Sequence, residues 1–414
     1  MAAMYRLVSL FGLFVMIGLA WLMSSHKGRV SWRLVGGGML LQFALGVVIL
    51  KTVQGRVLFE YVDRIFVKLL SFVDVGSEFL FGPEFREHFI AFSVLPTIIF
   101  FSAFMSIFYY YGVMQWIVGL FARLMQITLG TSGAETLSAA ANVFVGQTEA
   151  PLVIRPYIDT MTISELNAVM VGGFATIAGG VLAAYVHMGI SAQHLLSASV
   201  ISAPAALLIA KVMQPEVEVP KTLGEVHLEI KDTSTNVLEA ITSGTTGGLR
   251  LALNVAAMLL VFMALIAMVN GLVGWLGTQF GFQTETGDPL WSLEAGLSYL
   301  FAPLAWVMGI EWKDCFRAGE LLGLKMATNE FVAYLRLSEW QQAESGAELT
   351  ERTQTILTYA LCGFANFSSI GIQLGGIGGI APDRSGDLAK LGFRAMLGGT
   401  LAAFMTACVA GILI

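Results

Sequence analysis

Two apolar segments of the sequence are interrupted by polar side chains that could bind a solute or an ion. The first segment, 131–158, contains Asn142 and then the string GQTE, and the second, 316–337, contains Asn329 followed by Glu330. Carboxylates, amides and hydroxyls exchange hydrogen bonds with polar solutes, and their oxygens are suitable ligands for a hard cation. We therefore expect these segments to form the functional site.

The two interruptions belong to an internal repeat. The string NVFV at 142–145 matches NEFV at 329–332, and GFAT at 173–176 matches GFAN at 363–366. The paired strings occur in the same order, 31 residues apart in the first copy and 34 in the second. Two matches at nearly equal spacing indicate a duplication. Polar, broken segments at corresponding positions of two repeats are typical of the binding site of a secondary transporter.

The composition indicates that both copies lie in a membrane. Of the 414 residues, 56% are hydrophobic and only 13% are charged, and the mean hydropathy is +0.75. A soluble domain carries roughly 25% charged residues, so this chain has too few polar side chains to cover a surface in water. A net charge of −6 without a basic block gives no basis for nucleic-acid binding. The three cysteines and five histidines lack the spacing of a metal site.

Eight segments are apolar enough to cross a bilayer, which takes about 20 residues in a helix. They are residues 5–23, 34–50, 91–111, 164–188, 192–213, 247–276, 356–380 and 395–414. Lys27, Arg29 and Arg33 follow the first segment. Because lysine and arginine mark cytoplasmic loops, we expect the N-terminus outside the cytoplasm. Eight crossings then return the C-terminus to the same side.

Three other apolar stretches do not fit as crossings. Residues 113–129 place apolar side chains on one helical face, and residues 51–70 mix charged with aliphatic side chains, so both are expected to lie in the membrane interface. Residues 294–310 are apolar enough to span but number only 17, and hydropathy alone leaves a ninth crossing open. Because three crossings separate the two repeats, the second is predicted to be inverted relative to the first.

The carboxylates in the interrupted segments are candidates for binding. A carboxylate at the bilayer centre costs about 2.5–3.5 kcal/mol, which is tolerated mainly at functional sites. Glu149 and Glu330 are therefore predicted to be functional, although each could instead cap a helix or pair with a structural arginine, such as Arg155 for Glu149. Glu135 follows Ser132 at the spacing of a capping box and is predicted to be structural.

The longest motifs resemble those of the concentrative nucleoside transporter family. They are NVFVGQTEAPL at 142–152, NEFVAY at 329–334 and CGFANFSSI at 362–370. The resemblance covers essentially the whole chain and is closest to the shorter, bacterial, sodium-dependent branch. It implies an all-α polytopic membrane protein with eight transmembrane helices, two re-entrant hairpins and interfacial helices in inverted repeats. In such a protein residues 294–310 would lie flat.

The same resemblance implies a homotrimer in which a transport domain moves against a central scaffold. The scaffold would comprise residues 1–130, with crossings one to three and interfacial helices, and 247–315, with the sixth crossing and an interfacial helix. The transport domain would comprise 131–213, with the first hairpin and crossings four and five, and 316–414, with the second hairpin and crossings seven and eight. Residues 214–246 would form a cytoplasmic loop.

By the same resemblance, the motif positions imply which residues of this sequence bind the nucleoside. A nucleobase would be bound from the first hairpin and the fourth crossing, by Gln147, Thr148, Glu149 and Val181. A ribose would be bound from the second hairpin and the seventh crossing, by Glu330, Asn366 and Ser369, with Phe364 against the base.

A sodium ion would lie between the first hairpin and an unwound part of the fourth crossing. Its ligands would be the side chains of Asn142 and Thr176 and the carbonyls of Val145 and Ile177. The family usually has serine at the position of Thr176. Threonine keeps the hydroxyl, so the set of oxygen ligands is preserved.

These features predict a symporter, not an enzyme, that takes up nucleosides such as uridine, cytidine and adenosine with sodium. It would work by alternating access in the bacterial inner membrane, with both termini periplasmic and no cofactor besides the coupling ion. A proton-coupled carrier of the same fold is the main alternative. A membrane-embedded enzyme is disfavoured because neither hairpin contains paired carboxylates or a nucleophile–histidine pair. A channel is a further alternative, and it would differ from a symporter by passing solute without saturation or ion coupling.

Overall fold

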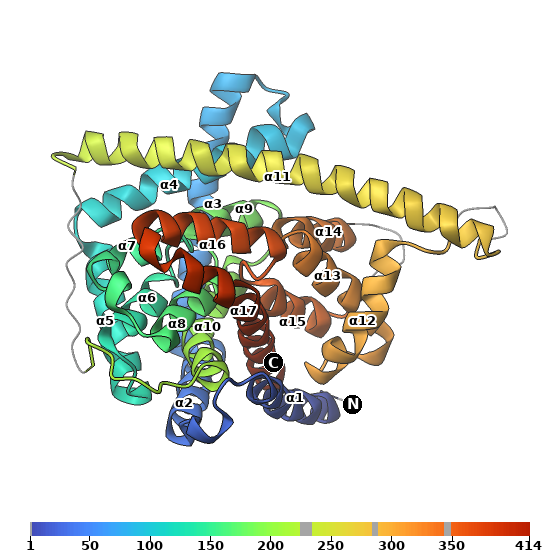
Figure 1. Ribbon diagram of the computed structural model, residues 1–414. Coiled ribbons are helices and arrows are strands. Elements are labelled where there is room, and N and C mark those ends of the chain that lie inside the picture. The colour runs from blue at the N-terminus through green and yellow to red at the C-terminus, as the bar shows by residue number, and fades with distance from the viewer. Residues whose placement is uncertain (1, 224–233, 284–288, 343–348) are drawn as a thin grey trace.

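The computed structural model describes residues 2–223, 234–283, 289–342 and 349–414 (Figure 1). Within these ranges the regular structure is helical, apart from one isolated bridge between Gln283 and Pro289. The predicted all-α fold class is therefore confirmed.

Seven helical segments in the described ranges are long and apolar enough to cross a membrane. They are Ala3–Leu22, Trp32–Leu50, Ile90–Tyr110, Ile163–His187, Ala192–Met213, Val237–Gln279 and Pro382–Leu413. Each corresponds to a predicted crossing. The remaining predicted crossing, 356–380, is divided into α15 (Glu351–Leu361) and α16 (Phe367–Ile380), with non-helical residues between them.

The first third of the chain forms five α-helices, among which α3 differs most from the sequence prediction. The helices are α1 (Ala2–Leu22), α2 (Trp32–Leu50), α3 (Val53–Phe81), α4 (Leu95–Tyr110) and α5 (Val113–Leu129). The predicted interfacial segment 51–70 was too short, because α3 continues to Phe81. Its start is capped by Thr52, whose Oγ1 accepts a hydrogen bond from the Gly55 N–H at 3.0 Å. Its end is set by Gly82, which has a φ of +86°.

Helix α11 (Val237–Gln279) also differs from the prediction, because it begins ten residues before the expected crossing 247–276. Asn236 caps it by accepting the Glu239 N–H at 2.9 Å, and the helix then continues through polar residues that hydropathy does not register as helical. The predicted loop 214–246 is correspondingly shorter, and residues 224–233 of it lie outside the described residues. Figure 1 shows α11 running across one side of the molecule and projecting beyond it.

Each repeat contains a short helical hairpin close to its predicted position. The first consists of α6 (Gly133–Ala141), α7 (Ala150–Val153) and the 3-10 turn η4 (Arg155–Thr160). The second consists of α13 (Cys315–Ala327) and α14 (Glu330–Gln342). Helix α12 (Leu293–Val307) packs along α13. With 15 residues it is about 22 Å long at 1.5 Å per residue, which is too short to cross a hydrocarbon core of about 30 Å.

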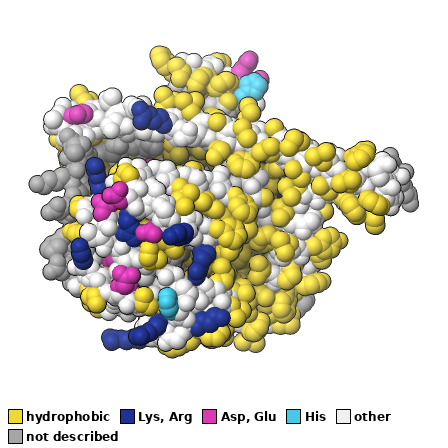
Figure 2. All heavy atoms as spheres, in the orientation of Figure 1, with side chains coloured by type: hydrophobic (Ala, Val, Ile, Leu, Met, Phe, Trp, Pro, Cys, Tyr) yellow, Lys and Arg dark blue, Asp and Glu magenta, His cyan; other side chains and the backbone are white. Residues whose placement is uncertain are grey.

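The remaining helices form the centre of the molecule. They are α8 (Ile163–Ala175), α9 (Gly179–His187), α10 (Ala192–Met213) and α17 (Ser385–Leu413). In the most apolar windows of Ala192–Met213 and Pro382–Leu413, 94% and 89% of the residues are buried, against 17% in Val237–Gln279. Hence α10 and α17 are surrounded by protein, whereas α11 presents an apolar surface to its surroundings. Figure 2 shows this hydrophobic surface along α11, with charged side chains gathered toward the end where α11 begins.

Candidate substrate and ion site

Two broken helices meet at the centre of the molecule. Helix α8 ends at Ala175 and α9 begins at Gly179, and the second break separates α15 from α16. The Phe364 N–H in the second break donates to the Thr176 carbonyl in the first at 3.3 Å. The repeated strings GFAT and GFAN therefore lie at two breaks whose backbones touch.

Gly363 permits this close approach. Its φ of +126° is a conformation that L side chains rarely adopt. A Cβ at this position would also lie 2.8 Å from the Phe174 carbonyl oxygen. The free N–H and C=O groups of the breaks are thus buried in protein, which makes an unwound backbone tolerable at membrane depth.

The Glu330 carboxylate is buried beside these breaks, with 4% of the residue exposed. The Tyr185 hydroxyl donates to its Oε1 and the Asn366 amide donates to its Oε2, each at 3.0 Å. Asn366 is also the N-cap of α16, because its Oδ1 accepts the Ser369 N–H at 2.9 Å. The start of α16 thereby orients an amide toward the carboxylate.

The tip of the first hairpin reaches the same group of residues through Gln147. Its Nε2 donates to the Ser369 hydroxyl at 3.2 Å, and its Oε1 accepts from Gln373 Nε2 at 3.1 Å. Gln373 Nε2 also donates to the Met170 carbonyl of α8 at 3.1 Å. A continuous buried polar chain therefore runs from Gln147 through Ser369 and Asn366 to Glu330.

The other predicted nucleoside-binding residues differ in burial and in their contacts. Thr148 packs on α16, since a Cβ at Gly376 would lie 2.8 Å from its Cγ2. Val181 is buried in α9 and Phe364 is partly buried in the second break. Glu149 is exposed and accepts a hydrogen bond from the Thr148 hydroxyl at 3.0 Å. Its suggested ion pair with Arg155 is not formed in the part of the chain that the structure describes.

The predicted sodium ligands lie where the first hairpin meets the first break. The Gly179 N–H at the start of α9 donates to the Phe144 carbonyl at 3.1 Å, which joins the hairpin to the break. Asn142 ends α6 with 1% exposure, and neither Oδ1 nor Nδ2 of its side chain has a hydrogen-bond partner among the described residues. A buried amide without partners loses about 1–3 kcal/mol for each unmade hydrogen bond. A cation bound to Oδ1 would compensate the part of this loss that belongs to the oxygen.

Thr176, the second predicted side-chain ligand, is equally buried. Its hydroxyl donates to the Gly172 carbonyl at 2.9 Å, which leaves the lone pairs of Oγ1 available to a cation. A Cβ at Gly172 would lie 3.3 Å from Asn142 Nδ2, so the Asn142 side chain lies against the same turn of α8. Ile177 is fully buried and Val145 is partly buried. The donor set therefore fits a hard cation such as sodium.

Tyr185 and Gln373 belong to the polar chain but were missed from the sequence. Tyr185 lies four residues after Val181, and Gln373 four residues after Ser369. Residues four apart share a helical face. This spacing from a motif residue was the available signal for both.

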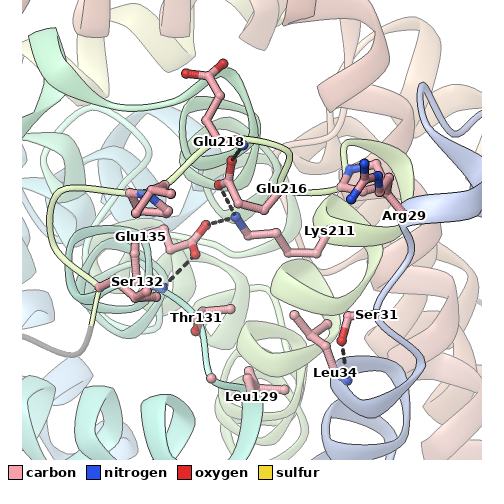
Figure 3. A pocket seen from close by; sticks show the side chains of 15 residues that line it. Arg29, Ser31, Leu34, Leu129, Thr131, Ser132, Glu135, Lys211, Glu216 and Glu218 are labelled. Carbon is pink, nitrogen blue, oxygen red and sulfur yellow. Dashed lines mark hydrogen bonds and ion pairs between the residues drawn. The ribbon is translucent and has the colours of Figure 1, made fainter.

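A separate cluster anchors the base of the first hairpin (Figure 3). Glu135 forms the predicted capping box with Ser132, which confirms its structural role. Lys211 of α10 pairs with Glu135 at 2.7 Å and with Glu216 at 3.2 Å. A cavity of about 270 Å³ opens beside this cluster, also lined by Arg29 of the predicted scaffold. None of the predicted site residues lines the cavity, and the Lys211–Glu135 ion pair beside it ties α10 to the start of the first hairpin.

Three family models match consecutive parts of the chain. They describe the N-terminus of a Na+ dependent nucleoside transporter at residues 11–84, a nucleoside recognition (gate) region at 91–192, and the C-terminus of a Na+ dependent nucleoside transporter at 194–411.

Curated relatives match over nearly all of this chain. Solute carrier family 28 member 3 of Eptatretus stoutii is 46% identical over 419 residues, which cover 99% of this chain and 60% of that protein. Sodium/nucleoside cotransporter 1 of Rattus norvegicus is 44% identical over 420 residues, covering 99% of this chain and 64% of that protein. The chain thus spans 60 to 64% of the length of these relatives.

Solved structures of the transporter CNTnw match the whole fold. CNTnw in an inward-facing substrate-bound state has a TM-score of 0.91 at 42% identity, with 100% of this chain and 98% of that chain covered. A CNTnw variant in an outward-facing state has a TM-score of 0.92 at 42% identity, with 99% and 98% covered. On these matches, and with its motifs gathered at two broken helices, the chain belongs to the Na+ dependent nucleoside transporter family.

Proposed function

We propose that this protein is a sodium-coupled symporter that imports nucleosides, such as uridine, cytidine and adenosine, across the bacterial inner membrane by alternating access. The observation that carries the proposal is the buried polar chain from Gln147 to Glu330 at the two helix breaks. A polar chain at this depth is costly unless it binds a polar solute. The relatives named as sodium/nucleoside cotransporters identify the class of that solute and of its coupling ion.

Glu330 is the proposed ribose-binding residue. An ionised carboxylate has about four acceptor positions, and Tyr185 and Asn366 use one on each oxygen. The remaining positions suit the two vicinal hydroxyl donors of a ribose. Ser369 and Asn366 extend this polar surface from α16, and Phe364 offers an aromatic face to the base.

Gln147 is the proposed centre of base recognition. Its amide uses one N–H toward Ser369 and one lone pair toward Gln373, so one donor and one acceptor remain for the edge of a base. Thr148 and Glu149 follow it at the hairpin tip, and Val181 adds apolar contact from α9. Because Glu149 is exposed, its contact with a base would require the tip to close over the solute.

Sodium is proposed to bind the Asn142 and Thr176 side chains and the carbonyls of Val145 and Ile177. Bound there, it would supply positive charge and connect the first hairpin to the first break. The hydrogen bond between Phe364 N and the Thr176 carbonyl links that break to the nucleoside side of the site. Ion and nucleoside would therefore stabilise the same arrangement of the two breaks, which is the basis of coupling.

Alternating access is supported by the states in which CNTnw has been solved, which include inward-facing substrate-bound and outward-facing ones. We propose the same division as in the sequence prediction, with residues 1–130 and 247–315 as scaffold and 131–213 and 316–414 as transport domain. The apolar surface of α11 supports contact with membrane lipid and assembly as a homotrimer. Both termini are proposed to be periplasmic.

The direct test is uptake of radiolabelled uridine into proteoliposomes containing the purified protein. We expect saturable uptake that requires an inward sodium gradient and is inhibited by unlabelled cytidine and adenosine. Equal uptake driven by a proton gradient without sodium would identify the proton-coupled alternative. Non-saturable uptake without ion coupling would identify a channel.

A further inference from the structure

Lys325 is a buried cation that the proposed transport mechanism does not yet use. It lies in α13 with 2% of the residue exposed. Its ammonium donates to the Ala360 carbonyl, in the last turn of α15, at 3.0 Å. Throughout the described ranges it takes part in no ion pair within 4.0 Å. A charge in this position is costly, because one carbonyl replaces only part of its hydration.

Glu330, the proposed ribose-binding carboxylate, carries the opposite charge and lies in the same hairpin. Lys325 precedes it by five residues, and the two side chains form no ion pair within 4.0 Å. A cation so close in the same hairpin stabilises an ionised carboxylate, and Tyr185 and Asn366 contact the Glu330 oxygens directly. Its attachment to Ala360 also ties the second hairpin to the helix that leads into the second break.

The internal repeat gives Lys325 a counterpart in the first hairpin. Lys325 lies four residues before Asn329, and Ser138 lies four residues before Asn142. Each is thus one helical turn before the repeated asparagine. Lys325 is the long, charged member of this pair, and Ser138 is the short, neutral one.

The two counterparts differ in whether their polar groups are satisfied by protein. In the first repeat, Ser138 Oγ and both side-chain atoms of Asn142 are buried without a partner among the described residues. In the second repeat, Lys325 binds Ala360, and Asn329 Oδ1 accepts the Val332 N–H at 3.0 Å. The first repeat therefore leaves side-chain oxygens free for a diffusible cation, whereas the second repeat contains a covalently attached cation, the Lys325 ammonium.

We propose that the Lys325 ammonium is a tethered cation that takes, in the second repeat, the place of the coupling sodium in the first, and that it positions Glu330 for the ribose. The proposal rests on the proposed nucleoside transport. The first half of the site then forms only when sodium binds. The second half keeps its charge balance throughout the transport cycle.

The positioning role is tested by Lys325→Met, which keeps an unbranched side chain only one atom shorter and removes the charge. Binding of uridine and 2′,3′-dideoxyuridine is measured by calorimetry on the purified protein at saturating sodium. We expect the preference for uridine to fall by roughly tenfold, the effect of one charge-assisted hydrogen bond. In a Glu330→Gln background the same change should cause no further loss of preference, because Lys325 acts through that carboxylate. Equal weakening of both nucleosides would overturn the positioning role.

Controls separate this proposal from folding and from the proposed function. Lys313→Met removes an exposed cation from η5 (Trp312–Asp314), just before the same hairpin, and should leave the preference unchanged. If Lys325→Met does not fold, the neutral double variant Lys325→Met/Glu330→Gln decides: recovery of folded protein supports the pairing, and no recovery contradicts it. Failure of the wild type to bind uridine would overturn the proposed function itself.

The tethered-cation role is tested by Lys325→Ser, which copies Ser138 of the first repeat. Removal of the ammonium should open the second half to a diffusible cation. We expect the sodium dependence of uridine binding to become steeper, with a Hill coefficient higher than that of the wild type. A sodium dependence identical to the wild type in midpoint and steepness would show that Lys325 does not take the place of a cation.

Discussion

Glu330 combines deep burial with hydrogen-bonding capacity that the protein leaves partly unused. Its two protein donors each contact a different oxygen, so both oxygens keep an acceptor position. The donors themselves are held in place, since Tyr185 is fully buried and Asn366 caps α16. The carboxylate is therefore oriented before a nucleoside arrives, which reduces the entropy lost on binding.

Replacing Glu330 by Gln should weaken uridine uptake while the protein remains folded. The side chain keeps its size but loses charge-assisted hydrogen bonds of roughly 1.5–3 kcal/mol. We expect uptake at low substrate to fall at least tenfold, and 2′- or 3′-deoxynucleosides to bind the wild type more weakly than uridine. Initial uptake rates measure the first effect and competition assays the second. Unchanged uptake of low uridine by a folded variant would contradict the ribose assignment.

Thr176 gives the matching prediction for the ion. Thr176→Val preserves the shape of the side chain but removes the oxygen, so the sodium concentration for half-maximal uptake should rise by roughly tenfold. Thr176→Ser keeps the hydroxyl and should have a mild effect. Removal of the Asn142 amide oxygen should act like Thr176→Val. Sodium titrations at saturating uridine provide the measurement, and an unaltered midpoint in Thr176→Val would place the ion elsewhere.

At the scale of elements, the decisive feature is the contact between the two breaks. Neither α8–α9 nor α15–α16 could remain unwound alone in lipid, because its free backbone groups would have no partners. The Phe364–Thr176 backbone hydrogen bond and the packing of Gly363 on Phe174 allow each break to cover the other. The first hairpin adds a third backbone contact, from Phe144 to Gly179.

Gly363→Ala should disrupt this contact. The variant combines an unfavourable φ, which costs about 1–3 kcal/mol, with a Cβ 2.8 Å from the Phe174 carbonyl oxygen. We expect a lower unfolding temperature and strongly reduced uptake, with thermal unfolding followed in detergent. Gly371→Ala, on an exposed position of α16 with no atom within 4 Å of the added Cβ, is the matched control. Equal stability of the two variants would mean that the breaks are not in close contact.

At the scale of the whole molecule, two groups of arginine contacts mark opposite ends. Arg384, in the short connection before α17, donates to the Ile158 carbonyl at 3.0 Å, beside the exit of the first hairpin. Arg352, at the start of α15 after the second hairpin, donates to the Gly411 carbonyl near the C-terminus at 2.7 Å. Arg6 donates to the carbonyl of the C-terminal Ile414. These contacts group the predicted cytoplasmic connections together and the predicted periplasmic ends together, as inverted repeats require.

Cysteine labelling tests this inversion. In a background with Cys315, Cys362 and Cys408 replaced, Asp159→Cys in η4 should react with an impermeant thiol reagent only from the cytoplasmic side. Glu351→Cys at the start of α15 should react only from the periplasmic side. Both positions are exposed, so access is limited by the membrane instead of by packing. Labelling of both from one face would contradict the inversion and, with it, the assignment of base and ribose to separate hairpins.

The sequence by itself determined that the chain lies in a membrane and contains an internal repeat, and it identified most residues of the candidate site. A charged fraction of 13% requires lipid around the chain. The strings at Asn142 and Asn329 mark the end of the first helix of each hairpin, α6 and α13. The strings GFAT and GFAN mark the two breaks. These features are local, since they depend on residue type and on spacing along one segment.

Only the tertiary structure decided which side chains meet. Tyr185 and Glu330 lie 145 residues apart in sequence, and Gln147 and Gln373 lie 226 apart, yet each pair forms a hydrogen bond. Their contact depends on which faces of α9, α14, α16 and the first hairpin pack together, and a pattern within one helix carries no information on its neighbour. The polar start of α11 was missed in part for the same reason, because its packing on α4 is tertiary, although its asparagine cap was a local signal. The difference between a satisfied Lys325 and an unsatisfied Ser138 and Asn142 likewise exists only in three dimensions, because hydrogen-bond partners are set by packing.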